Sequence, residues 1–172
     1  LAIAADTDRS LVRGWLWLGL LALIVSGVYS ILLVASRTPG INAMLPVADF
    51  FRVALVVHVD LSVLVWFLAL AGMLWSLSSR PRAPALGWLA LALACAGTAM
   101  LGIAPFTGSG LPIMANYIPV LDGGMFLYGL AVLGVAAALL VLRSLIAAPA
   151  LGMAFDGSDV LRFGLNASVI AT

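Results

Sequence analysis

Residues 14–36 read GWLWLGLLALIVSGVYSILLVAS and contain no charged side chain. A bilayer core of about 30 Å needs about 20 apolar residues in a helix, and this run is long enough. Further charge-free runs cover residues 61–79, 83–121 and 123–142, and the longest is cut by Pro and Gly residues between 105 and 119. We therefore predict an all-α, polytopic membrane protein with four transmembrane helices, at about Val12–Ala35, Phe51–Ser78, Ala85–Ala104 and Leu121–Ile146.

The composition of the whole chain supports this fold class. Of 172 residues, 65% are hydrophobic and 9% are charged, against about 25% charged in an ordinary soluble domain. The net charge is only +1, which excludes the basic face of a nucleic-acid-binding protein, and the hydrophobicity excludes disorder. The single cysteine, Cys95, excludes a disulfide framework within the chain, and we expect it to be a small core residue.

The C-terminal residues indicate a second region. We divide the chain into a four-helix transmembrane domain, residues 1–153, and a joint with a further segment, residues 154–172. Ser158 is placed to cap a new helix, and the sequence becomes apolar again before Thr172. This pattern predicts either the start of a fifth helix, as in the N-terminal portion of a longer protein, or an amphipathic tail on the membrane surface.

The arginines predict the orientation in the membrane. Four spans place both termini and the middle polar segment on one side, with six arginines against two on the other. The six are Arg9, Arg13, Arg80, Arg82, Arg143 and Arg162; the two are Arg37 and Arg52. The positive-inside rule then predicts an integral protein of a bacterial inner membrane with both termini in the cytoplasm. Trp15, Trp17 and Trp88 are expected in an aromatic belt at the cytoplasmic interface.

Ionisable residues inside the spans are costly and mark candidate functional positions. His58, the only histidine, lies about two turns inside the second predicted helix. Small residues share its face, including Ala54, Ala69 and Gly72, and such a strip accommodates either a flat ligand or a closely packed helix. From spacing alone, His58 is therefore either a packed, hydrogen-bonded polar residue or a metal ligand.

Two acidic residues, Asp49 and Asp60, lie beside or within the same predicted helix. Asp49 and Arg52 are three residues apart and are expected to pair at its outer end. Asp60 is about 200° around the helix from His58 and cannot orient that ring. It is neutral, paired to a helix outside this region, or part of a proton or water path.

The segment FRVALVVHVDLSVLVWF, residues 51–67, resembles the second transmembrane helix of subunit I of haem–copper oxidases, especially the cbb3-type and nitric-oxide-reductase branch. Residues 116–122, NYIPVLD, resemble the same group. That family has about twelve spans, begins in the cytoplasm, and uses a histidine in the outer half of helix two as an axial ligand of a low-spin haem. The match covers about four spans and the start of a fifth. The chain departs from the mitochondrial-type pattern because it lacks a His-Gly pair followed by Met, and Asp60 stands where an amide is expected.

The resemblance implies that His58 binds the iron of a low-spin haem, with Arg52 and Ser62 as further cofactor-binding candidates and Arg37 near the propionates. The implied protein is the N-terminal part of the catalytic subunit of a respiratory terminal oxidase that receives electrons from a cytochrome c or a quinol. The second haem and the copper would be bound by later helices. Two alternatives remain: a non-enzymatic four-helix scaffold or accessory subunit of a larger complex, and a small b-type carrier in which two copies share one haem.

Overall fold

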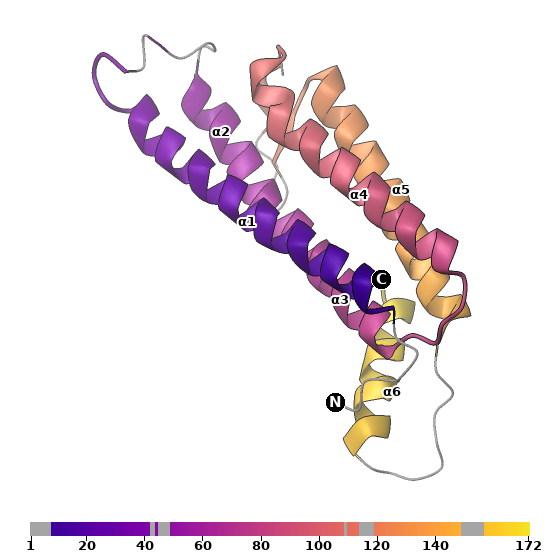
Figure 1. Ribbon diagram of the computed structural model, residues 1–172. Coiled ribbons are helices and arrows are strands. Elements are labelled where there is room, and N and C mark those ends of the chain that lie inside the picture. Colours follow the sequence, from indigo (N-terminus) through magenta and orange to yellow (C-terminus); the bar gives the residue numbers. More distant parts are fainter. Residues whose placement is uncertain (1–7, 42–43, 45–48, 109, 114–118, 149–156) are drawn as a thin grey trace.

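The computed structural model describes residues 8–41, 44, 49–108, 110–113, 119–148 and 157–172 (Figure 1). Its elements in chain order are α1 (Arg9–Ser36), α2 (Phe50–Val59), the π-helical segment η2 (Asp60–Val65), α3 (Trp66–Ser78), α4 (Pro84–Ile103), the 3₁₀ turn η3 (Ala104–Phe106), β1 (Pro112–Ile113), β2 (Val120–Leu121), α5 (Gly124–Ile146) and α6 (Gly157–Ile170).

The structure confirms the predicted fold class, because four of the helices are long and apolar enough to cross a membrane. These helices cover Arg9–Ser36, Phe50–Ser78, Pro84–Phe106 and Gly124–Ile146. The second helix is continuous through η2, which inserts a wider π turn in its middle. The chain therefore has the architecture of a membrane protein.

Local chemistry explains where the helices begin. The Asp8 side chain accepts a hydrogen bond from the Leu11 amide at 3.1 Å and caps α1, and Pro84 occupies the first turn of α4. The last span, predicted from about Leu121, begins three residues later, because Leu121 pairs with Pro112 in a two-stranded antiparallel ribbon. Gly123 is still extended, so α5 begins at Gly124. Ser158 lies inside α6, and residues 154–156 of the predicted joint lie outside the described residues.

The long helices form two pairs that lie along each other (Figure 1). In the first pair, α1 packs along α2, η2 and α3. Gly72 of α3 lies under the indole of Trp15, and a Cβ at Gly72 would overlap that ring. Gly19 of α1 faces Trp66 in the same way, with ring atoms 3.1 Å from where its Cβ would be. Two tryptophans thus fill the gaps opposite two glycines, which fixes the register of this pair.

The second pair, α4 and α5, has a glycine on each helix at the crossing. A Cβ on Gly97 would lie 2.8 Å from the carbonyl oxygen of Gly129, and one on Gly129 would lie 2.9 Å from Cβ of Met100. Only hydrogen atoms at both positions let the two backbones approach so closely. This is the small-residue contact that is common between helices in lipid.

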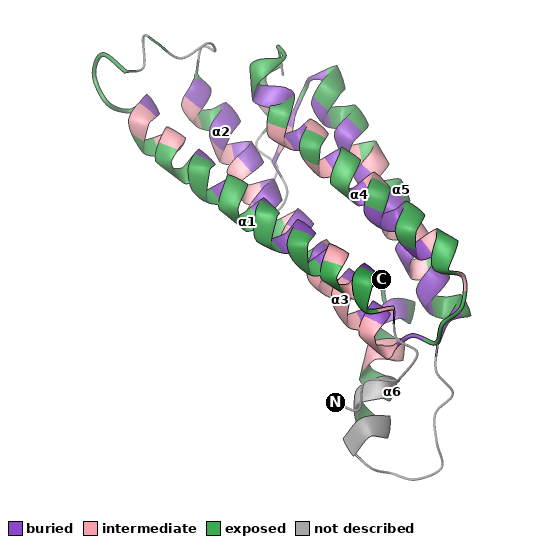
Figure 2. Cartoon of the chain, in the orientation of Figure 1, coloured by how far each residue is buried: buried purple, intermediate pink, exposed green. Residues whose placement is uncertain are grey.

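The surface of the helices is apolar, as lipid contact requires. Buried residues face the neighbouring helices, whereas exposed residues, many of them large and hydrophobic, cover the outer sides of α1, α4 and α5 (Figure 2). Two sequence-based expectations are corrected here. Trp15 is completely buried rather than part of an interfacial belt, because it packs on Gly72; Trp17 is 60% exposed as expected. Cys95 is exposed, not a core residue, because α4 turns it away from α5.

The substitution Gly97→Ala is expected to lower the free energy of unfolding of the purified protein by about 1–3 kcal/mol, since the added methyl forces α4 and α5 apart. Thermal unfolding in detergent, followed by circular dichroism, measures this change. Gly134→Ala on α5 is the matched control, because a Cβ there meets nothing within 4 Å. Equal melting temperatures for the two variants would contradict the close crossing.

Candidate functional site

His58 lies in the last turn of α2 and is held by Ser26 of α1. Its ring Nδ1 lies 2.9 Å from the Ser26 carbonyl oxygen, and the Ser26 hydroxyl donates to the His58 carbonyl oxygen at 3.0 Å. Ser26 Oγ is also 2.9 Å from Nδ1. Because a carbonyl oxygen only accepts hydrogen bonds, this arrangement assigns the proton of a neutral ring to Nδ1 and leaves the lone pair on Nε2.

The Nε2 edge of His58 is free to bind something else. No hydrogen bond to Nε2 is formed within the described part of the chain, and His58 is only partly buried. Leu55 and Ser62, one turn away on either side, are partly buried as well, so this face is not closed over by the described helices. In metal-ligating imidazoles the ring N–H that does not face the metal is commonly held by a carbonyl or a carboxylate, and Nδ1 of His58 has such a partner in the Ser26 carbonyl oxygen.

The strip of small residues beside His58 serves helix packing. Ala54, Ala69 and Gly72 are all buried, and Trp15 and Gly19 of α1 lie against its far end. The sequence left two interpretations of this strip open, a flat ligand or a closely packed helix. In the structure a closely packed helix, α1, lies against it. A flat ligand at His58 would therefore lie outside this contact, against the partly buried face.

Ser62 was predicted to bind a cofactor, but its hydroxyl is used by the backbone. It donates to the His58 carbonyl oxygen at 2.7 Å and lies 3.3 Å from the Val59 carbonyl oxygen. The π turn widens the helix here and leaves carbonyls in need of donors. The carbonyl of His58 thus accepts hydrogen bonds from two hydroxyls, Ser26 and Ser62, which fixes the position of His58 from both sides.

Arg52 at the start of α2 and Arg37 at the end of α1 have other partners. Arg52 pairs with Asp49 at 3.3 Å, as predicted, with both side chains at least half exposed. Such a surface pair contributes about 0–1 kcal/mol, so it can readily exchange partners. The Arg37 guanidinium lies 3.8 Å above the ring of Phe51 in a cation–π contact. Arg52 is about 9 Å from His58 along the helix axis at 1.5 Å per residue.

Asp60 faces a different surface from His58 and is unpartnered. The residue is 1% exposed, and neither carboxyl oxygen has a hydrogen-bond partner among the described residues. It lines a cavity of about 400 Å³ between the η2–α3 segment and α5. A buried polar group without a partner costs about 1–3 kcal/mol, which sequence inspection could suspect but not establish.

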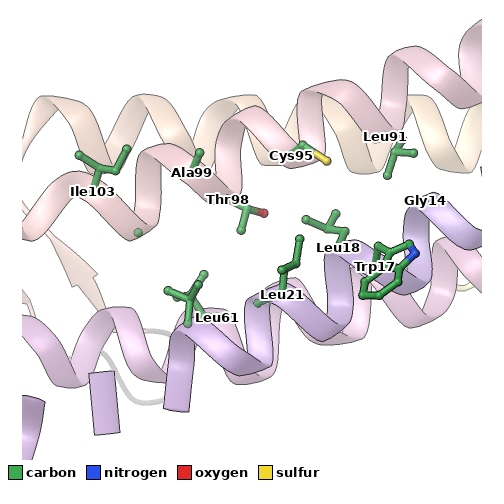
Figure 3. A pocket seen from close by; sticks show the side chains of 13 residues that line it. Gly14, Trp17, Leu18, Leu21, Leu61, Leu91, Cys95, Thr98, Ala99 and Ile103 are labelled. Atoms are coloured by element: carbon green, nitrogen blue, oxygen red, sulfur yellow. The ribbon is translucent and has the colours of Figure 1, made fainter. Parts of the chain in front are cut away.

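A second hollow, an apolar groove of about 500 Å³, lies between α1 and α4 (Figure 3). Leu18, Leu21 and Leu61 point toward α4, and Cys95 and Thr98 line the opposite wall. The Thr98 hydroxyl is already bonded to the Ala94 carbonyl oxygen at 2.7 Å. The groove therefore presents an apolar surface, and His58 belongs to the lining of neither hollow.

The sequence also missed a buried cation. Arg143, which the orientation argument placed at the cytoplasmic end of the last span, is 3% exposed and lies over Gly87 of α4. Its Nη1 is 3.4 Å from Ser76 Oγ, and its Nε has no partner in the part of the chain that is described.

No three His, Cys, Asp or Glu side chains among the described residues lie together in a way that could hold one metal ion.

Comparisons with known proteins give a relative but no family. No protein-family model and no solved structure matches the chain. The chain is 29% identical over 152 residues to an uncharacterized protein of Rickettsia prowazekii (strain Madrid E), RP382, and this match covers 74% of the chain and 30% of that protein. The chain thus spans about 30% of the length of the curated relative that it matches.

The tautomer of His58 can be measured directly, since the chain has only one histidine. In protein labelled with ¹⁵N-histidine, we expect a protonated, pyrrole-type Nδ1 and an unprotonated, pyridine-type Nε2 in the NMR spectrum near neutral pH. Ser26→Ala should leave these shifts nearly unchanged, because the Ser26 carbonyl oxygen remains. A pyridine-type Nδ1 would contradict the assigned hydrogen bond.

Asp60→Leu is expected to raise the free energy of unfolding of the purified chain by about 1–3 kcal/mol, because it removes a buried carboxyl that has no partner. Chemical unfolding in mixed micelles measures the change. Asp122→Leu, at an exposed carboxylate that forms no ion pair among the described residues, is the control and should have an effect within about 0.5 kcal/mol. A destabilised Asp60→Leu chain would mean that the carboxyl has an internal partner.

Proposed function

We propose that this chain is the N-terminal membrane portion of the catalytic subunit of a haem–copper respiratory oxidase, and that His58 is one axial ligand of its low-spin haem. The observation that carries the proposal is the orientation of His58, whose Nδ1 is bonded to Ser26 and whose Nε2 lone pair is left for a metal. The resemblance of residues 51–67 to helix two of that family supports it independently of the geometry.

The residues around His58 suit one ligand of a haem rather than a complete site. His58 is the only histidine of the chain, so a second histidine ligand would come from outside residues 1–172. Neither hollow is lined by His58, so most of the surface around a haem at Nε2 would come from other helices. Arg37 and Arg52 lie at the same end of the bundle, at the end of α1 and the start of α2. Either guanidinium could pair with acidic groups of such a cofactor, and Arg52 would first have to release Asp49.

The role of this chain is to hold and orient the His58 imidazole that would bind the haem iron. Haem with two axial ligands supplies one-electron transfer and has no open position for oxygen. Ser26 keeps the lone pair of His58 on Nε2, and Ser26 with Ser62 fixes the backbone that bears the ring.

The proposed location follows from the charges. With Arg9, Arg13, Arg80 and Arg82 at one end of the bundle and Arg37 and Arg52 at the other, the positive-inside rule places the start of α1 in the cytoplasm of a bacterial cell. His58 then lies in the outer half of the inner membrane, where a cytochrome c or a quinol can deliver electrons.

His58→Ala in the complete protein is expected to abolish the low-spin haem band in the reduced-minus-oxidised visible spectrum of purified membranes, because an axial ligand is lost. Added imidazole should restore part of the band by occupying the vacated position. Thr98→Val is the control, since it removes another polar group within a span but not a ligand.

An unchanged spectrum in His58→Ala would refute haem ligation by this residue. A wild-type protein without any haem band would favour the scaffold alternative, in which His58 only ties α1 to α2.

A further inference from the structure

The Asp60 carboxyl has no hydrogen-bond partner among the described residues, although polar groups lie near its cavity. Trp75 and Thr172 line the same cavity, but the Trp75 indole N–H donates to Ser168 Oγ at 2.9 Å. The Thr172 hydroxyl donates to the Ser168 carbonyl oxygen at 2.8 Å. Both potential donors are therefore engaged with α6, and Asp60 receives nothing from them.

The remaining wall of the cavity is apolar and reaches the surface of the bundle. Its described lining includes Val59, Val63 and Phe67 on one side and Ala137 and Val141 of α5 on the other. Val63 is 46% exposed and Phe67 is 62% exposed, so the rim of the cavity faces whatever lies beside the bundle. The hollow, of about 400 Å³, has room for a large side chain that enters from this face.

We propose that the face formed by Val63 and Phe67 is the docking surface for a further transmembrane helix, which inserts a hydrogen-bond-donating side chain into the cavity and bonds to Asp60. A carboxyl buried in a membrane bundle is normally paired, and lipid acyl chains have no donor to offer. The match covers only 30% of the Rickettsia relative, so a protein of that length has further polypeptide from which such a helix could come. The proposal does not depend on haem binding, because Asp60 and His58 belong to different faces.

The test is site-specific photocrosslinking of the protein in the membranes of the cell that makes it. A benzophenone amino acid replaces Phe67, and the same probe at Ile24 of α1 is the matched control. Ile24 is 60% exposed and lines neither hollow, and it lies about 8 Å along α1 from Gly19, which packs on Trp66. Mass spectrometry of the crosslinked peptides identifies what touches each position.

The expected result is a crosslink at Phe67, but not at Ile24, to a transmembrane peptide that carries a donor side chain within about one turn of the modified residue. Asp60→Leu should lower the yield about tenfold, and Asp60→Asn, which still hydrogen-bonds, should retain most of it. Asp60→Ala is a second, smaller replacement that guards against misfolding of the leucine variant.

Removal of the donor on the partner helix should lower the yield as Asp60→Leu does, with no further loss when both changes are combined. The proposal is overturned if Phe67 crosslinks only to lipid or to a second copy of this chain. It is equally overturned if the yield is the same in wild type and Asp60→Leu.

Discussion

The reciprocal hydrogen bonds between Ser26 and His58 are the contact on which the polar chemistry of this bundle depends. No water is present in a bilayer core to satisfy an imidazole, so its partners have to come from protein. Ser26 provides a carbonyl oxygen for the ring and a hydroxyl for the backbone, and it joins α1 to α2 through both. The backbone carbonyl of Ser26 thereby assigns the proton of a neutral ring to Nδ1.

The helix that carries His58 has polar groups on two faces, and they differ in whether they have hydrogen-bond partners. On the α1 side, hydroxyls from Ser26 and Ser62 meet the His58 carbonyl, and small residues let Trp15 and Trp66 pack closely. On the α5 side, Asp60 is enclosed by apolar side chains and has no partner among the described residues. The π turn begins at Asp60, directly after the His58–Val59 step. Such turns are frequent at functional sites because they reorient side chains within a helix.

Charge-free runs were sufficient to predict four spans, since lipid leaves so few ways to satisfy a backbone. The pair Asp49–Arg52 was predicted too, because i,i+3 spacing alone brings the side chains together. Tertiary packing decided what the sequence missed. From the sequence, Trp15 has the position of an interfacial belt residue, but it is buried because Gly72 leaves space for its ring. Arg143 has the position of a charge that flanks a span, but it is buried because Gly87 leaves space for its side chain. The bond of His58 to Ser26 joins residues 32 positions apart, which no local pattern specifies.

Ligation by His58 within a haem–copper subunit is the central functional claim, and the amount of haem bound per polypeptide tests it most directly. The wild-type protein purified from its membranes can be assayed as the pyridine haemochrome, with the polypeptide quantified by amino-acid analysis and its intact mass recorded. Coordination inside one polypeptide predicts at least one haem per chain. No haem at all, or half a haem per chain in a strict dimer, would contradict it.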